Sequence, residues 1–372
     1  MTDARTLHRG LLTLDAHLDV PVHFSRPGWS FGERHRLIDD VAQVDLPRME
    51  DGNLSGGFFV LYAEQGSLEA DGYATALAAM RRRSDEIDTM LAAFPSRIGA
   101  ALTAADARRL HAERRCIAFR SIENSYFLGD DLAGLSEFHA RGVRLAGPVH
   151  ARTNQLADSA TDAARWGGLS PLGEEWVAEM NRLGMVIDAS HASDAAFDAM
   201  LKRSETPLVL SHSGARARFD HPRNLDDDRL RMLARAGGVI GFTTIFLSTL
   251  RLGSEGRDLF ARQGRIGQLD PDGQRELARR WNALKEVEPM WDATFDDYME
   301  GLLHVIEVAG IDHVGFGGDW DGGGGLRGFE DVTGHPRITE RLVRHGFSEG
   351  DLVKLWSGNL LRVLEAVERH AR

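Results

Sequence analysis

The chain has 372 residues, of which 42% are hydrophobic and 27% are charged, as expected for a globular protein with a large core. Its formal net charge of −12 repels phosphate backbones and anionic lipids, so neither nucleic acid nor a membrane is an expected partner. The single cysteine, Cys116, excludes a disulfide framework and a multi-cysteine zinc site. No secretory signal or membrane-spanning stretch is recognisable, and we expect a cytoplasmic protein with a small-molecule ligand.

Eight short apolar runs recur along the chain. They lie at 12–17, 57–63, 116–123, 143–150, 185–191, 207–213, 238–245 and 313–320. Segments with helical periodicity separate most of them, at 72–94, 104–114, 131–140, 171–183, 193–203 and 226–236. Eight strands alternating with helices predict an α/β fold, a (β/α)8 TIM barrel. A doubly wound open sheet gives similar local signals, and it stays an alternative on pattern alone.

Two regions depart from this alternation. Residues 246–292 follow the seventh run and are polar and Arg-rich, which indicates a helical insertion or a lid over the site. Residues 337–369 predict a C-terminal helical tail of two helices, broken at the Ser-Gly-Asn sequence of 357–359. Because no low-complexity linker divides the chain, we expect a single domain over 1–372.

Residues that can bind a metal or move a proton stand at the ends of six of the eight predicted strands. They are His17 and Asp19, Glu123, His150, His191, His212 and Asp319. In a barrel these strand ends converge on one face, where catalytic groups lie. Side chains at i and i+2 of a strand point to the same side, so the first two can both face the barrel axis. So many coincidences favour a functional site over structural residues.

Imidazole and carboxylate groups are the ligands of zinc in catalytic sites. Five such ligands exceed what one catalytic zinc ion uses, whereas two metals at ~3.5–4 Å sharing a carboxylate fit better, with Glu123 as the natural bridge. A carboxylated lysine is not expected as the bridge, because the three lysines, Lys202, Lys285 and Lys354, stand at no strand end. Asp188, three residues before His191, is expected behind the ligands.

The remaining histidines have simpler interpretations. His8, His111, His139, His345 and His370 lie in polar or helical surroundings, where we expect solvated surfaces. His313 begins the eighth run and is expected at the opposite end of the barrel from the site.

Longer motifs are distributed along almost the whole chain. They are DAHLDVP at 15–21, SIEN at 121–124, GVRLAGPVHARTN at 142–154, GLSPLGEEWVAEMNRLGMVIDASHAS at 168–193, SHSGARA at 211–217, HPRNLDDDRL at 221–230 and DHVGFGGDWDG at 312–322. In these motifs the chain resembles the membrane (renal) dipeptidases, the M19 metallopeptidases of the amidohydrolase superfamily.

The resemblance implies a (β/α)8 barrel that holds two zinc ions. By motif position, His17 and Asp19 are similar to the ligands of the first ion, Glu123 to the bridge, and His191 and His212 to the ligands of the second. His150 is similar to the family histidine that contacts the substrate carbonyl. Arg223 is similar to the arginine that binds the substrate carboxylate, and Asp319 to the aspartate near the substrate amine and the attacking water. A homodimer is also expected from the resemblance.

Together these observations predict a zinc-dependent dipeptidase that hydrolyses free dipeptides with a hydroxide bridging the two metals. His150 would donate to the oxyanion, and Asp319 would act as general base and then acid. The preference between L-L and L-D substrates stays open. One alternative is another binuclear amidohydrolase that acts on N-acyl amino acids or lactams. A non-catalytic metal-binding barrel is less favoured, because a structural metal needs neither Asp319 nor His150.

Overall fold

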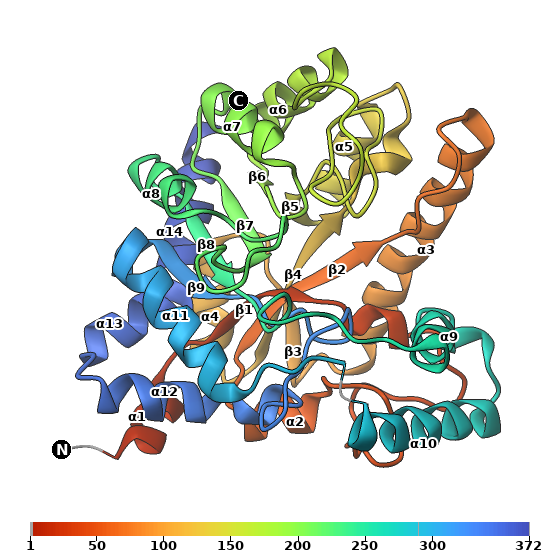
Figure 1. The fold of residues 1–372 in the computed structure, drawn as a ribbon, viewed down its shortest axis with the longest axis vertical. Coiled ribbons are helices and arrows are strands. Elements are labelled where there is room, and N and C mark those ends of the chain that lie inside the picture. Colours follow the sequence, from red (N-terminus) through yellow and green to blue (C-terminus); the bar gives the residue numbers. More distant parts are fainter. Residues whose placement is uncertain (1–2, 289, 372) are drawn as a thin grey trace.

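Parallel strands form the centre of the protein in the computed structural model, which describes residues 3–288 and 290–371. One sheet has the order β1 (Leu14–Leu18), β2 (Gly56–Tyr62), β4 (Cys116–Glu123), β5 (Val143–Ala146), β6 (Val186–Ile187), and a short β3 (Ile98–Ala100) pairs with β4. A second sheet has the order β7 (Val209–Ser213), β8 (Val239–Phe242), β9 (Val314–Phe316). Isolated parallel bridges, Asp188 with Val209 and Leu18 with Trp320, link the ends of the two sheets. The result is an α/β fold built on a curled parallel sheet (Figure 1).

Helices cover the outside of this sheet (Figure 1). They are α3 (Ala70–Ala93), α4 (Ala104–Ala112), α5 (Ala133–Ala140), α6 (Pro171–Leu183), α7 (Asp194–Arg203), α8 (Asp227–Arg235) and α11 (Phe295–Ala309). Helix α6 illustrates why they form. The Ser170 side chain caps its first turn by accepting from the Gly173 backbone N–H, and Gly184 ends it with φ of 70°. Its inward face buries Trp176 and Met180 against the sheet.

Several strands end earlier than the sequence predicts. Strands β5, β6 and β9 stop at Ala146, Ile187 and Phe316. The prediction that His150, His191 and Asp319 end strands is therefore wrong. They lie in the loops that follow the strands. The φ angles of His191 and Asp319 are +65° and +58°, in the left-handed region that a paired strand does not accommodate. Each such residue costs about 1–3 kcal/mol of strain, which the surrounding packing offsets.

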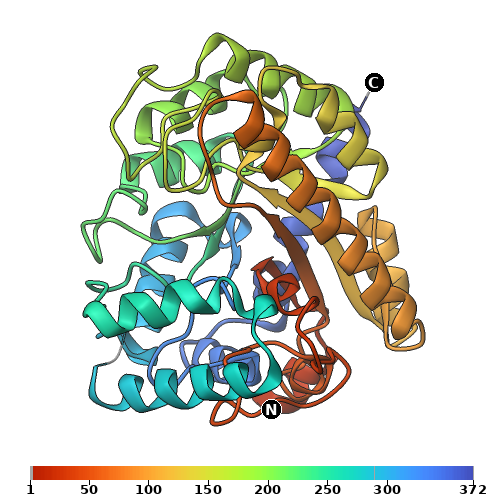
Figure 2. The same ribbon diagram turned by 90° about the vertical axis from the view of Figure 1, so that its right-hand side faces the viewer.

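Residues 246–292 contain two helices, α9 (Ser254–Gln263) and α10 (Pro271–Val287), joined through the turn η3 (Ile266–Gln268). Figure 2 shows them beside the N-terminal segment that follows β1. The Arg26 Nε–H donates to Gln274 Oε1 of α10 at 3.0 Å, and the Gln274 amide donates to the carbonyl of Pro27 at 3.3 Å. Helix α10 therefore braces residues 26–27, which follow Asp19 in the chain.

The C-terminal tail differs from its prediction. It consists of α12 (His335–Arg344), α13 (Glu349–Val353) and α14 (Asn359–His370), with a π-helical turn over Lys354–Gly358. The break expected at 357–359 is wrong, because the π turn joins α13 directly to α14. The helical structure is interrupted instead after α12, where Gly346 has φ of 89°. Ser348 then caps the start of α13 in a capping box with Asp351.

The N-terminal helix α1 (Ala4–Gly10) packs on α12 and corrects another expectation. His8 is fully buried rather than solvated. Its Nδ1 lies 2.7 Å from Thr339 Oγ1, and its Nε2 lies 3.0 Å from the carbonyl oxygen of Gly52. The partners are distant in sequence, so the local polarity around His8 gives no sign of them.

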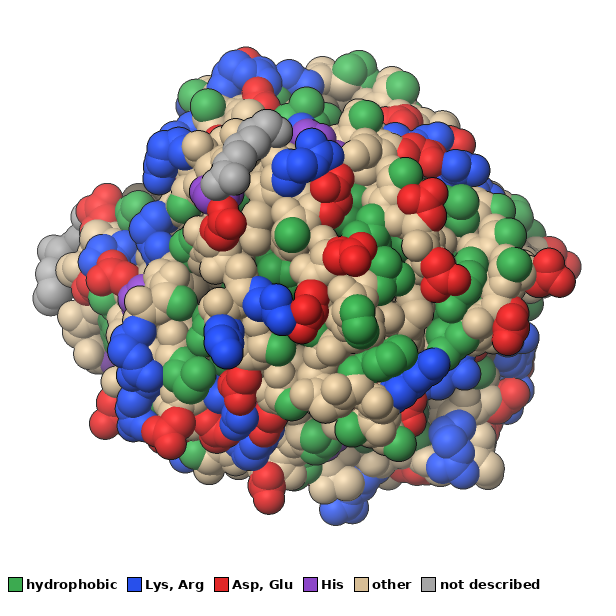
Figure 3. Space-filling view, turned by 90° about the horizontal axis from the view of Figure 1, so that it is seen from above, with side chains coloured by type: hydrophobic (Ala, Val, Ile, Leu, Met, Phe, Trp, Pro, Cys, Tyr) green, Lys and Arg blue, Asp and Glu red, His purple; other side chains and the backbone are tan. Residues whose placement is uncertain are grey.

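The surface carries both signs of charge. Figure 3 shows acidic and basic side chains interspersed on the face seen from above. Among the helices of residues 3–288 and 290–371, none has both the length and the apolar character needed to cross a bilayer.

Candidate metal centre

The first cluster of ligand atoms forms where β1 and β4 end. His17 lies in β1, Asp19 precedes the short helix η1 (Val20–His23), and Glu123 is the last residue of β4. His17 Nε2 lies 3.3 Å from Asp19 Oδ2 and 3.8 Å from Glu123 Oε1. The three side chains together have the spacing of a metal-binding group. The structure thus brings together three of the side chains that the sequence places at predicted strand ends.

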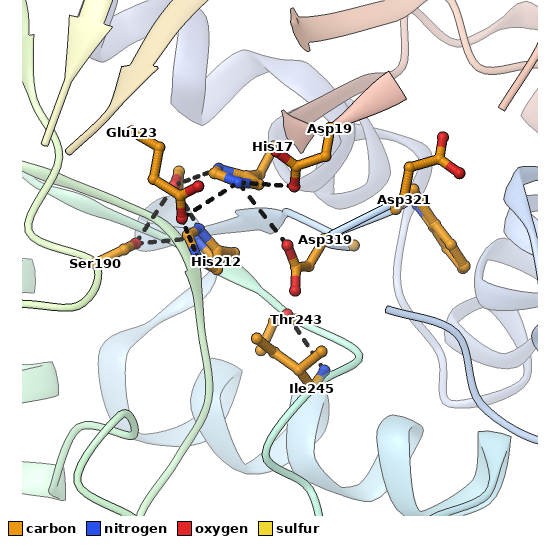
Figure 4. A network of polar contacts seen from close by, with 12 residues as sticks. His17, Asp19, Glu123, Ser190, His212, Thr243, Ile245, Asp319 and Asp321 are labelled. Carbon is orange, nitrogen blue, oxygen red and sulfur yellow. Dashed lines mark hydrogen bonds and ion pairs between the residues drawn. The ribbon is translucent and has the colours of Figure 1, made fainter. Parts of the chain in front are cut away.

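A second cluster shares the Glu123 carboxylate. Its Oε1 lies 2.9 Å from His191 Nε2 and 3.6 Å from His212 Nε2. The two imidazole Nε2 atoms are themselves 2.9 Å apart. Figure 4 shows Glu123 facing both His17 and His212. One carboxylate oxygen therefore faces nitrogen atoms from both clusters.

Asp319 and His150 flank these clusters. Asp319 Oδ1 lies 3.8 Å from His17 Nε2, on the side away from Glu123 (Figure 4). His150 Nε2 lies 3.6 Å from Glu123 Oε1, and its ring packs against His191 with centroids 4.2 Å apart. All seven acidic and imidazole residues that the sequence singled out lie in one region.

Burial and mutual repulsion set the electrostatics of the cluster. Desolvation raises the pKa of Glu123 to about 8, and desolvation together with the charge of Asp19 raises the pKa of Asp319 well above its ordinary value. Burial opposes protonation of His17, but Asp19 and Glu123 outweigh it and raise its pKa to about 10. This concentration of buried carboxylates is the kind of site that a divalent cation stabilises.

Arg223 brings a positive charge to the same pocket. Its guanidinium is buried and donates to the carbonyl oxygen of His212 at 3.3 Å and to Ser213 Oγ at 3.5 Å. Within the described chain it has no carboxylate at ion-pair distance. Desolvation lowers its pKa to about 10, so it stays charged at neutral pH. A buried cation without an ion-pair partner is suited to bind an anionic group.

Comparison with known proteins identifies the family. The model of the membrane dipeptidase family, peptidase family M19, matches residues 1–372. The chain belongs to this family. It is 31% identical to dipeptidase tcpJ of Claviceps purpurea over 95% of this chain and 76% of that protein.

Solved structures agree with this assignment. The probable dipeptidase PvdM of Pseudomonas aeruginosa is 30% identical and superposes with a TM-score of 0.84, covering 99% of this chain and 98% of PvdM. A metallopeptidase of Rhodobacter sphaeroides, liganded with a phosphinate mimic of the dipeptide L-Ala-D-Ala, is 26% identical with a TM-score of 0.75, covering 96% and 99% of the two chains. The protein is a metallo-dipeptidase by these relationships.

The donor set fits the metal that the M19 family implies. His17 Nε2 is buried and has no hydrogen-bond partner among the described residues. It points toward carboxylate oxygens, as do the Nε2 atoms of His191 and His212. Imidazole nitrogen and carboxylate oxygen together are the preferred ligands of zinc and its neighbours, so these ring nitrogens are suited to a metal.

Two residues of this M19 site were missed by the sequence analysis. Tyr62 ends β2, and its hydroxyl lies 3.4 Å from His150 Nδ1, with ring centroids 4.9 Å apart. A polar aromatic residue at the end of the second apolar run was the available signal. Asp15 is buried beneath the site, where it accepts from the backbone N–H of Gly318 and from the Trp320 indole. It thereby ties β1 to the loop that carries Asp319.

Proposed function

We propose that this M19 protein is a zinc-dependent dipeptidase with two zinc ions per chain. His17 and Asp19 would hold one ion, His191 and His212 the other, and Glu123 would bridge them. The support is the position of Glu123 Oε1, which faces ring nitrogens of both pairs at 2.9–3.8 Å. Ring nitrogens from both pairs close to one carboxylate match what a shared bridge requires.

We also propose that the two sheets form one closed (β/α)8 barrel, a single domain over 1–372 with 246–292 as a helical insertion after its seventh strand. The two parallel bridges that link the sheets support closure. A closed barrel would bring all the ligand-bearing loops to one end.

The choice of substrate rests on Arg223. It is a buried guanidinium beside the metal ligands, without a carboxylate partner among the described residues. A guanidinium fork suits a carboxylate, and the free C-terminus of a dipeptide supplies one close to the scissile bond. Asp319, whose Oδ1 lies 3.8 Å from His17 Nε2, would face the free amine. A site that recognises both termini selects a substrate with a single peptide bond.

The residues would divide the chemistry among them. Bound zinc supplies an activated water and polarises the scissile carbonyl. Arg223 holds the substrate carboxylate, while His150 Nε2–H donates to the oxygen that gains negative charge. Asp319 accepts the proton of the attacking water and passes it to the leaving amine as the C–N bond breaks. Burial, together with the charge of Asp19, raises the pKa of Asp319, which favours its uptake of that proton.

The proposal includes dipeptides with a D residue at the C-terminal end. The support is the related Rhodobacter sphaeroides enzyme, which binds a mimic of L-Ala-D-Ala.

Hydrolysis by zinc-loaded protein tests the function. L-Ala-L-Ala and L-Ala-D-Ala should be cleaved, while their N-acetylated and C-amidated forms should be cleaved at least ~10-fold more slowly, because each loses a charge-assisted contact. Preferential cleavage of the N-acetylated compounds would instead identify an N-acyl amino acid hydrolase. Absence of cleavage of every compound would refute a dipeptidase.

A further inference from the structure

Ser211 contacts one imidazole from each of the two clusters. It lies in β7 with its side chain fully buried. Its Oγ is 2.8 Å from Nδ1 of His212 and 3.2 Å from Nδ1 of His17. These are the ring nitrogens that point away from Glu123. The two rings lie side by side with centroids 3.8 Å apart, so a single hydroxyl reaches both.

Asp188 determines the direction of the Ser211 hydroxyl. Its Oδ1 accepts the backbone N–H groups of Ser190 and Ser211, both at 2.9 Å, which fixes the carboxylate in place. Its Oδ2 lies 2.5 Å from Ser211 Oγ. A carboxylate only accepts, so the Ser211 O–H donates to Asp188. Ser190 Oγ, the remaining neighbour, is farther away at 3.4 Å.

A serine hydroxyl can donate one hydrogen bond and accept two. Because Ser211 donates its one hydrogen to Asp188, its Oγ has two lone pairs left, and both face ring nitrogens. Each Nδ1 must then carry the proton and donate it. A neutral imidazole with a proton on Nδ1 has its lone pair on Nε2, the atom that faces Glu123 in both residues.

We propose that Ser211, oriented by Asp188, is a positioning residue shared by the two metal sites, holding His17 and His212 in the tautomer that presents Nε2 to the metals. The expected effect on metal binding rests on the proposed function with two zinc ions. Because one hydroxyl contacts a ligand of each ion, its loss should weaken the binding of both. Loss of an outer hydrogen-bond partner of a ligand histidine typically costs 10–100-fold in metal affinity.

Asp188→Asn separates this role from simple packing. The amide keeps the shape of the carboxylate, and its oxygen can still accept the two backbone N–H groups. Its NH2 group then faces Ser211 Oγ and donates to it. The single serine hydrogen must turn to the nearer imidazole nitrogen, Nδ1 of His212 at 2.8 Å, which moves the ring proton of His212 to Nε2. A purely structural role for Asp188 predicts no such exchange.

The first measurement needs no metal. Nitrogen NMR of histidine-labelled, metal-free protein reports which ring nitrogen of His212 carries the proton. The proposal expects Nδ1–H in the wild type and Nε2–H in Asp188→Asn. An Nε2–H tautomer in the wild type, or an unchanged tautomer in the variant, overturns it. This outcome is independent of whether the protein is a dipeptidase.

The second measurement is zinc affinity, by competition with a chromophoric chelator. Ser211→Ala should raise the dissociation constants of both zinc ions by about 10–100-fold, and Asp188→Asn should raise chiefly that of the ion held by His212, whose tautomer it changes. Ser121→Ala is the matched control, because Ser121 is a buried strand serine whose Oγ has no partner among the described residues. It should leave both constants unchanged. Weakening of one ion alone by Ser211→Ala, or equal weakening by the control, overturns the coupling. A wild type that binds fewer than two ions refutes the proposed function, while the NMR result still decides the tautomer.

Discussion

Replacing Arg223 by methionine should damage catalysis without destabilising the protein. The guanidinium is buried, donates only to the His212 carbonyl and the Ser213 hydroxyl, and has no carboxylate at ion-pair distance among the described residues. Without substrate it is a desolvated charge, and methionine of similar length removes that cost. With substrate it would make a charge-assisted bond, and losing ~1.5–3 kcal/mol lowers kcat/KM by roughly 10–150-fold.

The assay compares L-Ala-L-Ala with its C-terminal amide, alongside urea unfolding of both proteins. We expect the loss for the free dipeptide alone, since the amide offers no carboxylate to Arg223. The free energy of unfolding should stay unchanged or rise. Equal loss on acid and amide would refute the carboxylate assignment, and a large drop in stability would show that Arg223 is a structural residue.

Three further substitutions test other parts of the account. Asp319→Asn keeps the shape but removes the proton acceptor, so kcat should fall about 100-fold or more while elemental analysis still finds zinc at the wild-type level. Tyr62→Phe leaves the ring against His150 but removes the hydroxyl, and kcat should fall about 5-fold with little change in KM. Desolvation lowers the pKa of buried His335 to about 3. The unfolded chain, with a histidine pKa of ~6.5, then binds more protons, so stability is lost as the pH falls below that value. Urea unfolding of metal-free protein at pH 7 and pH 5 should show His335→Phe losing about 2 kcal/mol less than the wild type; an equal loss would contradict the assignment.

The sequence anticipates the placement of most of the site because its signals are local. His17, Glu123 and His212 each stand in or at the end of a short apolar run, and runs that alternate with helices must align in parallel. Their convergence follows from topology without any knowledge of side-chain contacts. The helices are equally local, as the Ser170 cap and the Gly184 terminator of α6 illustrate.

What the sequence does not reveal depends on pairings between distant residues. His191 and Asp319 leave the strand conformation at left-handed φ angles, which the sequence does not assign to these two positions even though histidine and aspartate adopt them more often than most residues. Ser211 meets His17 across 194 positions, and His8 meets Thr339 across 331. Such contacts form only when the sheet curls and the two ends of the chain pack together. The sequence pattern around Ser211 and His8 therefore gives no sign of them.

Zinc content tests the central claim most directly. Protein reconstituted with zinc and freed of excess metal should contain two ions per chain by elemental analysis, and Glu123→Gln should lose zinc from both sites because its carboxylate would bridge them. Ser121→Ala should retain two. Fully active wild-type protein with no more than one zinc ion per chain, or a Glu123→Gln variant that retains both ions, would contradict the two-metal account.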